Sequence, residues 1–291
     1  SLSAISIGKG LQIAIKDKLY SLSPDLVIST YENNSRGIAS EKINNFESII
    51  SEIKNALTGI EIEKTIEKPT LISVDNSFET VIFRGVNNGY NFRDFNKFII
   101  GSKIKNDITN NEIIISKSLS DNLKILVGQN LTLYFQANNN QRIPNVRSFK
   151  VTHIYETDFP DFDNNYIIGN LETLQNVYKW SKNDFANIEI SVEDKLQISL
   201  IEKSISLLKS FEKNNLSTKT VQSKYANIFS WISIFDFNIL IITFLMILVA
   251  IISVIISLFI LIFERIKMIG ILTSMGSVSY THLTLPTSFE V

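Results

Sequence analysis

The sequence of 291 residues contains no cysteine and only two histidines. The absence of cysteine excludes disulfide bonds, thiolate metal sites and a cysteine nucleophile. Two histidines that are distant in sequence, His153 and His282, give little support for a histidine-rich metal site or a Ser-His-Asp triad. The 28 Lys and Arg residues against 29 Asp and Glu residues leave a net charge of −1, so the chain lacks the basic surface expected of a nucleic-acid-binding protein.

The sequence also lacks the phosphate-binding loop of NTPases, the glycine fingerprint of dinucleotide-binding folds and the nucleophile elbow of hydrolases. Asp158, Asp161 and Asp163 form an acidic loop whose oxygens suit Ca²⁺, but the glycine and final glutamate of a calcium loop are missing. We interpret this loop as a solvated turn, and His153 as a residue packed in a strand or at its edge. We therefore expect no catalytic residue, no metal and no cofactor, and we do not expect an enzyme.

One long segment is almost wholly apolar. Residues 237–263 contain no charged side chain, and Asp236 and Glu264 flank them. About 20 apolar residues are enough to span a bilayer core of about 30 Å. The ten Ile, five Leu, four Phe and two Val residues of the segment favour membrane insertion by roughly 6 to 13 kcal/mol. The segment is therefore predicted to be a transmembrane helix.

The flanking charges predict the orientation of this helix. Arg265 and Lys267 follow it directly, whereas Asp236 precedes it and the nearest upstream cation is Lys224. Because cytoplasmic flanks carry the excess of Lys and Arg, the C-terminal side is predicted to be cytoplasmic and the large N-terminal region to lie outside. Residues 221–263 contain no proline or glycine, which predicts one rigid helix from the N-terminal region through the bilayer.

The segment after the apolar run, residues 264–276, alternates charged and apolar side chains in a helix-like pattern. On the cytoplasmic face, such a segment offers apolar anchors and charges to a soluble docking partner. A short interfacial anchor is the alternative, and these residues do not separate the two interpretations.

The two ends of the sequence are unusual. Ile7, Leu11, Ile15 and Leu19 recur every four residues, which predicts an amphipathic helix. The first residues fit either the end of a preceding transmembrane helix or an ordinary soluble helix, and they do not form a whole signal peptide.

At the other end, residues 278–287 written back into codons resemble a transposase adapter used in preparing DNA sequencing libraries. We expect the native reading to stop near Gly276 and residues 277–291 to be a non-native tail. His282 then has no functional role.

Between these ends, short β-branched runs alternate with amphipathic helices. Strands are predicted at residues 26–30, 59–64, 70–74, 80–84, 112–116, 131–135 and 148–155. Helices are predicted at residues 40–57 and 194–211. This order predicts an α+β body in two parts, with a middle sub-region at about 100–190 inserted into the first, followed by a transmembrane α-helix of a truncated membrane protein.

Several short motifs are weak alone but occur in a characteristic order. Before the apolar run they are the segments 126–133 and 149–157, with Trp231 and Asp236. Within and after the run they are Val249, Ala250, Glu264, Arg265, Ile269, Ile271, Leu272 and Gly276. Their order and spacing resemble the FtsX-like permeases of ABC transporters, and most closely the LolC/LolE lipoprotein-releasing permeases, with a periplasmic core domain of the MacB type.

The resemblance implies a division of the chain. In order along the sequence, it comprises the end of a first transmembrane helix (1–8), a periplasmic core domain (9–222), a pre-membrane segment with the second transmembrane helix (223–263), a cytoplasmic coupling segment (264–276) and the tail (277–291). The location implied is the bacterial inner membrane, with several passes in the complete protein and a large periplasmic domain.

The resemblance also implies function and partners. Such permeases pair as homo- or heterodimers within membrane lipid, and a separate cytoplasmic ATPase subunit drives periplasmic motion, most simply the release of lipoproteins to a periplasmic carrier. The implied ATPase-coupling residues are Glu264, Arg265, Lys267, Ile269 and Gly270. The implied carrier-binding loop contains Arg142, Ile143, Pro144 and Arg147.

Two alternatives remain open. The same architecture serves MacB-like efflux and FtsX-like activation of cell-wall hydrolases. A different class of protein, a single-pass membrane-anchored binding or sensor module, would need no ATPase.

Overall fold

The computed structural model describes residues 2–36, 41–74, 77–92, 94–105, 107–136 and 144–276. Its contacts divide the chain into two compact units, Leu11–Ala226 and Ser1–Gly10 with Asn227–Val291. We call Leu11–Ala226 the body. The predicted tail at residues 277–291 lies outside the described residues.

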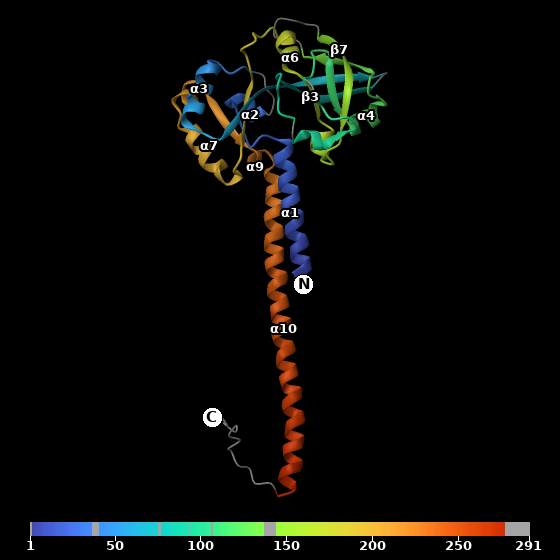
Figure 1. The fold of residues 1–291 in the computed structure, drawn as a ribbon, viewed down its shortest axis with the longest axis vertical. Coiled ribbons are helices and arrows are strands. Elements are labelled where there is room, and N and C mark those ends of the chain that lie inside the picture. The colour runs from blue at the N-terminus through green and yellow to red at the C-terminus, as the bar shows by residue number, and fades with distance from the viewer. Residues whose placement is uncertain are drawn as a thin grey trace, which may run out of the picture. The chain divides into compact units, whose positions relative to one another are not determined.

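In the described part of the chain, ten strands form one sheet: β1 (Leu26–Thr30), β2 (Ile60–Val74), β3 (Ser77–Val86), β4 (Ile99–Ile100), β5 (Glu112–Ser116), β6 (Asn130–Phe135), β7 (Asn145–Tyr155), β8 (Tyr166–Asn170), β9 (Asn187–Val192) and β10 (Leu216–Thr220). The helices are α1 (Leu2–Leu22), α2 (Tyr31–Arg36), α3 (Phe46–Ala56), α4 (Lys117–Leu123), α5 (Pro160–Asp163), α6 (Leu171–Tyr178), α7 (Ile198–Ser206), α8 (Lys209–Lys213), α9 (Val221–Lys224) and α10 (Ala226–Ser274), with short turns η1 (Phe95–Phe98) and η2 (Lys195–Gln197). The body has two parts: β7 and α4 lie in one of them, and α2, α3 and α7 lie in the other (Figure 1). The predicted α+β class, with a long apolar helix after the body, is confirmed.

Six of the strands close into a ring, which we call the barrel part. The second half of β2 pairs with β3, β3 with β8, β8 with β5, β5 with β7, β7 with β6, and β6 again with β2. Closure gives every strand in the ring two hydrogen-bonded neighbours, so the ring has no free edge.

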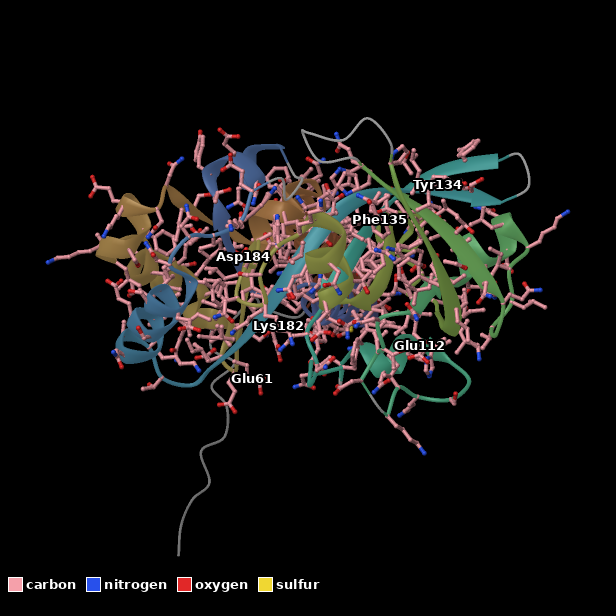
Figure 2. The ribbon with its side chains drawn as sticks, turned by 90° about the horizontal axis from the view of Figure 1, so that it is seen from above. Glu61, Glu112, Tyr134, Phe135, Lys182 and Asp184 are labelled. Atoms are coloured by element: carbon pink, nitrogen blue, oxygen red, sulfur yellow. The ribbon has the colours of Figure 1, made fainter. Side chains whose placement is uncertain are left out.

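Aromatic rings fill the interior of the barrel part. Phe83 lies 5.6 Å from Phe135 and 5.7 Å from Phe149, measured between ring centroids, and all three are buried. Strand alternation sends Phe135 inward and its neighbour Tyr134 outward, as the view from above shows (Figure 2). Gly169 on β8 lies against the far end of the Phe83 ring, where a larger side chain would collide with Cζ and Cε1.

The short strand β4 pairs with β7 at the margin of the barrel part. The other strands form the sheet part, in the order β10, β1, β9 and the first half of β2. Two helices bury apolar side chains spaced three and four residues apart in the core of the body. On α3 and α7 these side chains are Phe46, Ile49, Ile53, Ile198, Ile201 and Ile205. The sheet part therefore has a conventional core, formed by one amphipathic face of each helix.

β2 runs through both parts, although the sequence predicts separate strands at 59–64 and 70–74. That prediction is wrong because β3 pairs with β2 across the intervening residues, including Pro69 opposite Ile82. The Ile82 N–H donates to the Asn165 carbonyl, away from β2, so Pro69 and Ile82 form a non-hydrogen-bonded pair. The N–H that proline lacks therefore removes no bond to β3, and the strand continues.

Two predicted helices are shorter in the structure. The helix expected at 40–57 begins at Phe46, because Ile43 donates its N–H to the Phe185 carbonyl and Glu41 donates its N–H to Asn33 Oδ1. The helix expected at 194–211 is broken between α7 and α8, where Leu208 has an extended conformation with φ −68° and ψ 138°. Tertiary contacts therefore override the helical periodicity at both sites.

The long helix also differs from its prediction. Tyr225 leaves helical geometry, with φ −111° and ψ 37°, so the rod expected at 221–263 is divided into α9 and α10. Beyond the apolar run, α10 continues to Ser274 as a helix of 49 residues. Among the described residues, α10 is the one helix that is long and apolar enough to cross a membrane.

A buried lysine on β2 gives a pH-dependent prediction. Lys68 is 6% exposed, its ammonium lies 4.6 Å from the Tyr178 ring centroid, and burial lowers its pKa to about 8 from 10.5. Between these two values the unfolded chain binds a proton that the folded chain does not, so stability rises with pH across this window. We expect the native chain to gain about 2 kcal/mol over Lys68→Met between pH 7 and pH 10, as measured by urea unfolding.

The control for this prediction is Lys54→Met on the exposed side of α3. Its difference in unfolding free energy from the native chain should not change between the two pH values. A Lys68→Met difference that is equally constant would contradict the prediction.

Candidate functional site: where the chain enters and leaves the body

The chain enters and leaves the body at neighbouring positions. α1 leads into β1 and β10 leads into α9, and β1 and β10 are antiparallel neighbours with Leu26 opposite Thr220. The Val221 N–H donates to the Asp25 carbonyl at 3.1 Å. The antiparallel pairing thus places the end of α1 beside α9. We call residues 20–25 and 220–225 the exit site.

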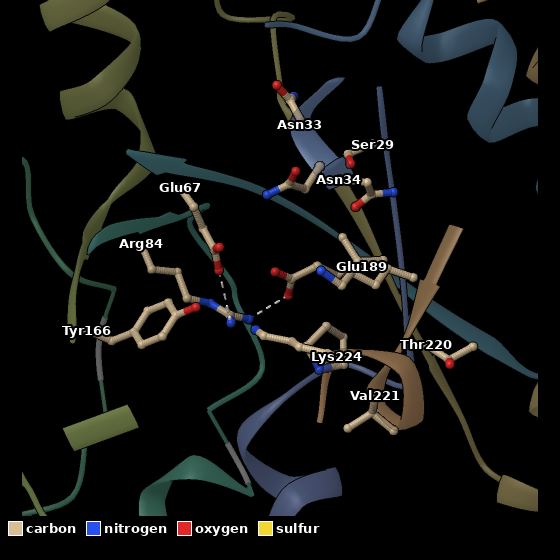
Figure 3. Close-up of a pocket in the computed structure, with 14 residues that line it drawn as sticks. Ser29, Asn33, Asn34, Glu67, Arg84, Tyr166, Glu189, Thr220, Val221 and Lys224 are labelled. Atoms are coloured by element: carbon tan, nitrogen blue, oxygen red, sulfur yellow. Dashed lines mark hydrogen bonds and ion pairs between the residues drawn. The ribbon is translucent and has the colours of Figure 1, made fainter. Parts of the chain in front are cut away.

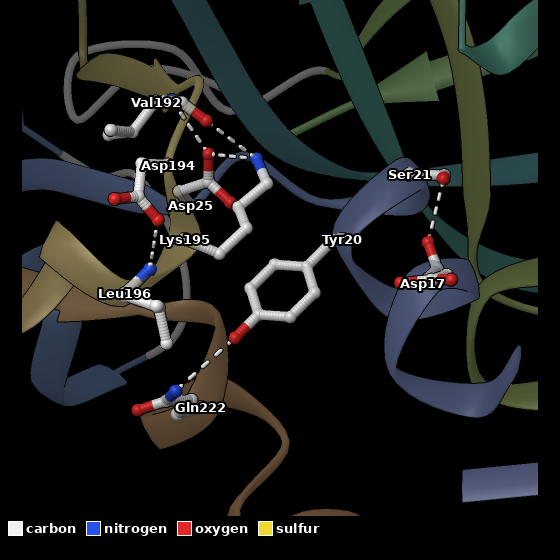
Figure 4. Close-up of polar contacts among 9 residues, drawn as sticks. All are labelled: Asp17, Tyr20, Ser21, Asp25, Val192, Asp194, Lys195, Leu196 and Gln222. Atoms are coloured by element: carbon white, nitrogen blue, oxygen red, sulfur yellow. Dashed lines mark hydrogen bonds and ion pairs between the residues drawn. The ribbon is translucent and has the colours of Figure 1, made fainter. Parts of the chain in front are cut away.

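Polar side chains hold the exit site to the sheet part (Figure 4). Gln222 on α9 donates through Nε2 to the Tyr20 hydroxyl of α1 at 3.2 Å. Asp25 is buried, and its Oδ2 accepts the Val192 N–H at 2.7 Å together with a bond from the Lys195 ammonium. The first residues after α1 are therefore tied to β9, and α9 is tied to α1.

Tyr225 connects the exit site with the barrel part. Its hydroxyl lies 3.0 Å from Ser23 Oγ, and its ring lies edge-on to Phe159, with 5.6 Å between centroids. α9 is capped by Thr220, whose side chain accepts the Ser223 N–H at 3.2 Å. These contacts explain why the helix is interrupted at Tyr225.

A cluster of charged and phenolic side chains lies beside the exit site (Figure 3). We call it the base cluster, and its members are Glu67, Arg84, Tyr166, Glu189 and Lys224. Arg84 is 4% exposed and donates from Nη2 to Glu189 Oε2 at 2.7 Å, while Nη1 lies 3.5 Å from Glu67 Oε1. A buried cation is thus paired with two carboxylates.

Strand register brings these groups together. Glu67 on β2 lies directly opposite Arg84 on β3, so their side chains share a face of the sheet. Glu189 comes from β9 on the other side of β2, and its Oε1 accepts the Thr65 hydroxyl at 2.7 Å. Arg84 Nη2 also donates to the Tyr90 hydroxyl at 3.0 Å. The cluster therefore joins three adjacent strands.

Electrostatics extend the cluster to α9. Burial alone would lower the pKa of Lys224, but Tyr166 and Glu67 outweigh it and raise that pKa. Glu67 and burial raise the pKa of Tyr166 to about 12. The Lys224 ammonium lies 5.5 Å from the Tyr166 ring centroid. Lys224 therefore remains protonated, and its ammonium lies beside the Tyr166 ring of β8.

In the Arg84–Glu189 pair, too, burial and the charge of the partner shift each pKa in opposite directions. Burial lowers the pKa of Arg84, but the Glu189 carboxylate outweighs it and raises that pKa well above its usual value. Burial raises the pKa of Glu189, against the effect of Arg84. The pair is thus stabilised by its own attraction in a site where neither charge is well solvated.

Two cavities meet at this pair. One, of about 110 Å³, is lined by Arg84, Glu189, Glu67 and Lys224 (Figure 3). The second, also of about 110 Å³, shares Arg84 and Glu189 and includes Tyr90. The ion pair therefore borders two cavities of mixed polar and apolar lining rather than being enclosed on all sides by packed side chains.

The predicted ATPase-coupling residues lie outside the body. Glu264, Arg265, Lys267, Ile269 and Gly270 are exposed and follow the apolar run within the last turns of α10. The structure continues the helix through them without a break, and their coupling role stays a prediction.

The predicted carrier loop is only partly described. Arg142 and Ile143 lie outside the described residues. Pro144 is exposed just before β7, and Arg147 is exposed within β7. The role of this loop also stays a prediction.

The acidic loop has a structural explanation in the described chain. Asp163 is buried, and its Oδ1 accepts the Thr157 N–H at 3.1 Å and the Thr157 hydroxyl at 2.7 Å. Asp158 pairs with Lys18 at 3.3 Å. Within the described residues, no group of three or more acidic, His or Cys side chains could hold a metal ion. His153 is half-buried on β7, with Nδ1 3.1 Å from Thr152 Oγ1, and burial lowers its pKa.

The sequence alone does not predict the base cluster. A signal existed, because Glu67, Arg84 and Glu189 are charged residues inside β-rich runs, and a charge in a buried strand requires a partner. The sequence could not supply the pairing, since Arg84 and Glu189 lie 105 positions apart.

The chain is similar to known proteins. A family model described as the MacB-like periplasmic core domain matches residues 2–207. The solved periplasmic region of MacB from Actinobacillus actinomycetemcomitans is 17% identical, with a TM-score of 0.45, over 70% of this chain and 91% of that one. The solved extracellular domain of the noncanonic ABC-type transporter YknZ from Gram-positive bacteria is 15% identical, with a TM-score of 0.43, over 67% of this chain and 99% of that one.

No curated protein matches the chain. The family match extends from α1 through α7, and so covers both the barrel part and most of the sheet part. Because it spans more than half of the sequence, the chain belongs to the family of MacB-like periplasmic core domains.

Proposed function

We propose that this chain is part of a permease subunit of an ABC transporter, in which α10 carries motion between a cytoplasmic ATPase and the periplasmic body. The observation that carries this proposal is the order of parts. A MacB-like periplasmic core domain is followed directly by a helix of 49 residues with an uncharged run at 237–263. The charged turn at 264–267 comes immediately after this run, where a cytoplasmic partner would reach it.

The exit site supports the same proposal. Motion of a helix is transmitted to a domain only through contacts that resist displacement. Asp25 accepts a hydrogen bond from β9, and the Tyr225 ring packs against Phe159. Gln222 donates to the Tyr20 hydroxyl. The residues before β1 and those after β10 are therefore both held in place. The proposed assembly contains two permease subunits in the inner membrane.

For the transported substrate, we propose lipoproteins passed to a periplasmic carrier. The support is the Arg142, Ile143 and Pro144 sequence, which resembles the carrier-binding loop of lipoprotein-releasing permeases. MacB-like efflux is the second candidate, because the matching family model bears the MacB name. Deletion of the gene separates them: retention of lipoproteins in the inner membrane supports the first, and sensitivity to exported compounds supports the second.

A charge reversal tests the coupling segment. In the full-length permease with its ATPase, Arg265→Glu combined with Lys267→Glu should reduce ATP-driven lipoprotein release about tenfold. The reason is that the two positive charges offered to the partner become negative. Release is measured as transfer of labelled lipoprotein from membrane vesicles to the soluble fraction.

The matched control reverses two exposed lysines of α8, Lys209→Glu with Lys213→Glu. Both double variants should insert in the membrane normally in protease-protection assays. Unchanged release in the Arg265 and Lys267 variant would rule out the coupling role.

A further inference from the structure

One of the two cavities beside the exit site lies on a polar face of the sheet part (Figure 3). We call it the exit cavity, and its lining includes the base cluster together with Val27, Ser29, Asn187 and Lys219. In the strand register Val27 lies opposite Lys219, and Ser29 lies opposite Asn187. Opposite residues of paired strands share a face, and the alternating residue Ile28 is buried in the apolar core on the other face. The sheet part therefore keeps a polar side as well as a conventional core.

Two buried polar groups of the exit cavity lack a partner. Asn187 is 7% exposed and Tyr166 is 8% exposed. In the part of the chain that the structure describes, the Asn187 side-chain amide and the Tyr166 hydroxyl have no hydrogen-bond partner. Buried polar groups are nearly always hydrogen-bonded, because an unpaired one loses its interaction with water without compensation. Both groups therefore require a partner that occupies the cavity.

Two ammonium groups of the same cavity are also without acceptors. Lys219 on β10 and Lys224 on α9 line the cavity and are half-buried. Among the described residues, neither lysine side chain forms an ion pair or a hydrogen bond. The Lys224 ammonium lies 5.5 Å from the Tyr166 ring and 5.6 Å from the Tyr225 ring, contacts that leave its N–H groups unpaired. The cavity thus presents several hydrogen-bond donors with no acceptor.

The size of the exit cavity limits what can occupy it. Its volume is about 110 Å³. A single water needs about 10–15 Å³ of such space, and a cavity of about 150 Å³ in another protein admits benzene, with its six carbon atoms. The exit cavity is therefore much larger than one water requires, and it suits a molecule of about four to six non-hydrogen atoms.

The charges of the lining indicate the sign of the occupant. Arg84, Lys219 and Lys224 carry three positive charges, against the two carboxylates of Glu67 and Glu189. Arg84 is already paired with Glu189 at 2.7 Å and lies 3.5 Å from Glu67, so the excess positive charge belongs to the lysines. A monoanion balances this excess, whereas a dianion or a cation would leave a half-buried charge uncompensated. A carboxylate is a monoanion that accepts hydrogen bonds from ammonium, amide and phenol groups.

We propose that the exit cavity binds a small monocarboxylate, held by the ammonium groups of Lys219 and Lys224, the Asn187 amide and the Tyr166 hydroxyl. Such a ligand contacts β8, β9, β10 and α9 at once. It therefore bridges the barrel part, the sheet part and the exit site. The proposal is independent of the transport role, because every residue that it uses belongs to the body.

Binding can be measured by saturation-transfer NMR on the full chain in a non-ionic detergent, in a buffer free of carboxylates and phosphate. Acetate, with four non-hydrogen atoms, is the probe. We expect saturable transfer to its methyl group with a dissociation constant in the millimolar range, as is typical of so small a ligand. Lys224→Met and Lys219→Met should each weaken binding about tenfold, because each removes a charged donor. Tyr166→Phe, which removes one hydroxyl and keeps the ring, should weaken it about threefold.

The controls separate the cavity from general attraction to a charged surface. Lys203→Met removes an exposed lysine of α7 outside the cavity and should leave the dissociation constant unchanged. Methylammonium, a cation of similar size, should show no saturable transfer, and an equal concentration of inorganic phosphate should not displace acetate. Near-ultraviolet circular dichroism establishes that each variant is folded.

Three results would overturn the proposal. The first is the absence of saturable transfer to acetate in the native chain, which would leave water as the occupant. The second is saturable binding of methylammonium in place of acetate. The third is an unchanged dissociation constant in the folded Tyr166→Phe chain and in both lysine variants, which would place acetate elsewhere on the surface.

Discussion

Replacing Arg84 with methionine is expected to lower the free energy of unfolding of the body by about 3–5 kcal/mol. Methionine occupies a similar volume, but it leaves the Glu189 carboxylate, which is 3% exposed, without its cation. Urea unfolding followed through Trp180 fluorescence measures the loss. A decrease below about 1 kcal/mol would show that Glu189 is well solvated or neutral in the folded state.

Two companion variants identify the cause of this loss. Arg84→Met combined with Glu189→Met removes both charges and should recover most of the stability, because uncompensated burial is the dominant cost. Glu189→Gln alone should cost less than Arg84→Met, since Arg84 keeps Glu67 at 3.5 Å and glutamine still accepts the Thr65 hydroxyl. A double variant as unstable as Arg84→Met would attribute the loss to packing instead.

Gly169→Ala should destabilise the body by about 3 kcal/mol. A β-carbon at Gly169 would lie 2.9 Å from Phe83 Cε1 and closer still to Cζ. Phe83 cannot yield easily, because Phe135 and Phe149 pack against it at centroid distances of 5.6 and 5.7 Å. Thermal or urea unfolding measures the effect, and loss of near-ultraviolet circular dichroism should report displacement of the aromatic core.

A second substitution tests whether the collision with Phe83 causes the loss of stability. Phe83→Leu in the Gly169→Ala background should restore part of the stability by making room for the methyl group. Gly10→Ala on α1 is the matched control, because its β-carbon would have no neighbour within 4 Å. If Gly169→Ala changed the free energy of unfolding as little as Gly10→Ala, β8 would not approach Phe83 as closely as described.

Local patterns predicted much of the secondary structure. β1 and β5 have the predicted limits because each is a short β-branched run whose residues are mostly buried. The long apolar helix was equally clear, since its composition alone favours a membrane. These features depend on neighbours in sequence, which a single sequence contains.

Features that depend on distant residues were not predicted. The continuity of β2 through Pro69 follows from its pairing with β3, and the break at Tyr225 follows from contacts with Ser23 and Phe159. The base cluster combines β2, β3, β8, β9 and α9, which are far apart along the chain. Such a site becomes visible only once the strand order is known.

The neighbouring positions at which the chain enters and leaves the body have an evolutionary consequence. Leu26 and Thr220 face each other across β1 and β10, so the segments that lead into β1 and out of β10 are adjacent. Domains with adjacent ends are readily exchanged, enlarged or replaced without rebuilding what they are attached to. Both junctions can therefore be cut and rejoined together, and a chimaera joined at residues 25 and 221 would preserve the spacing of the connecting chains.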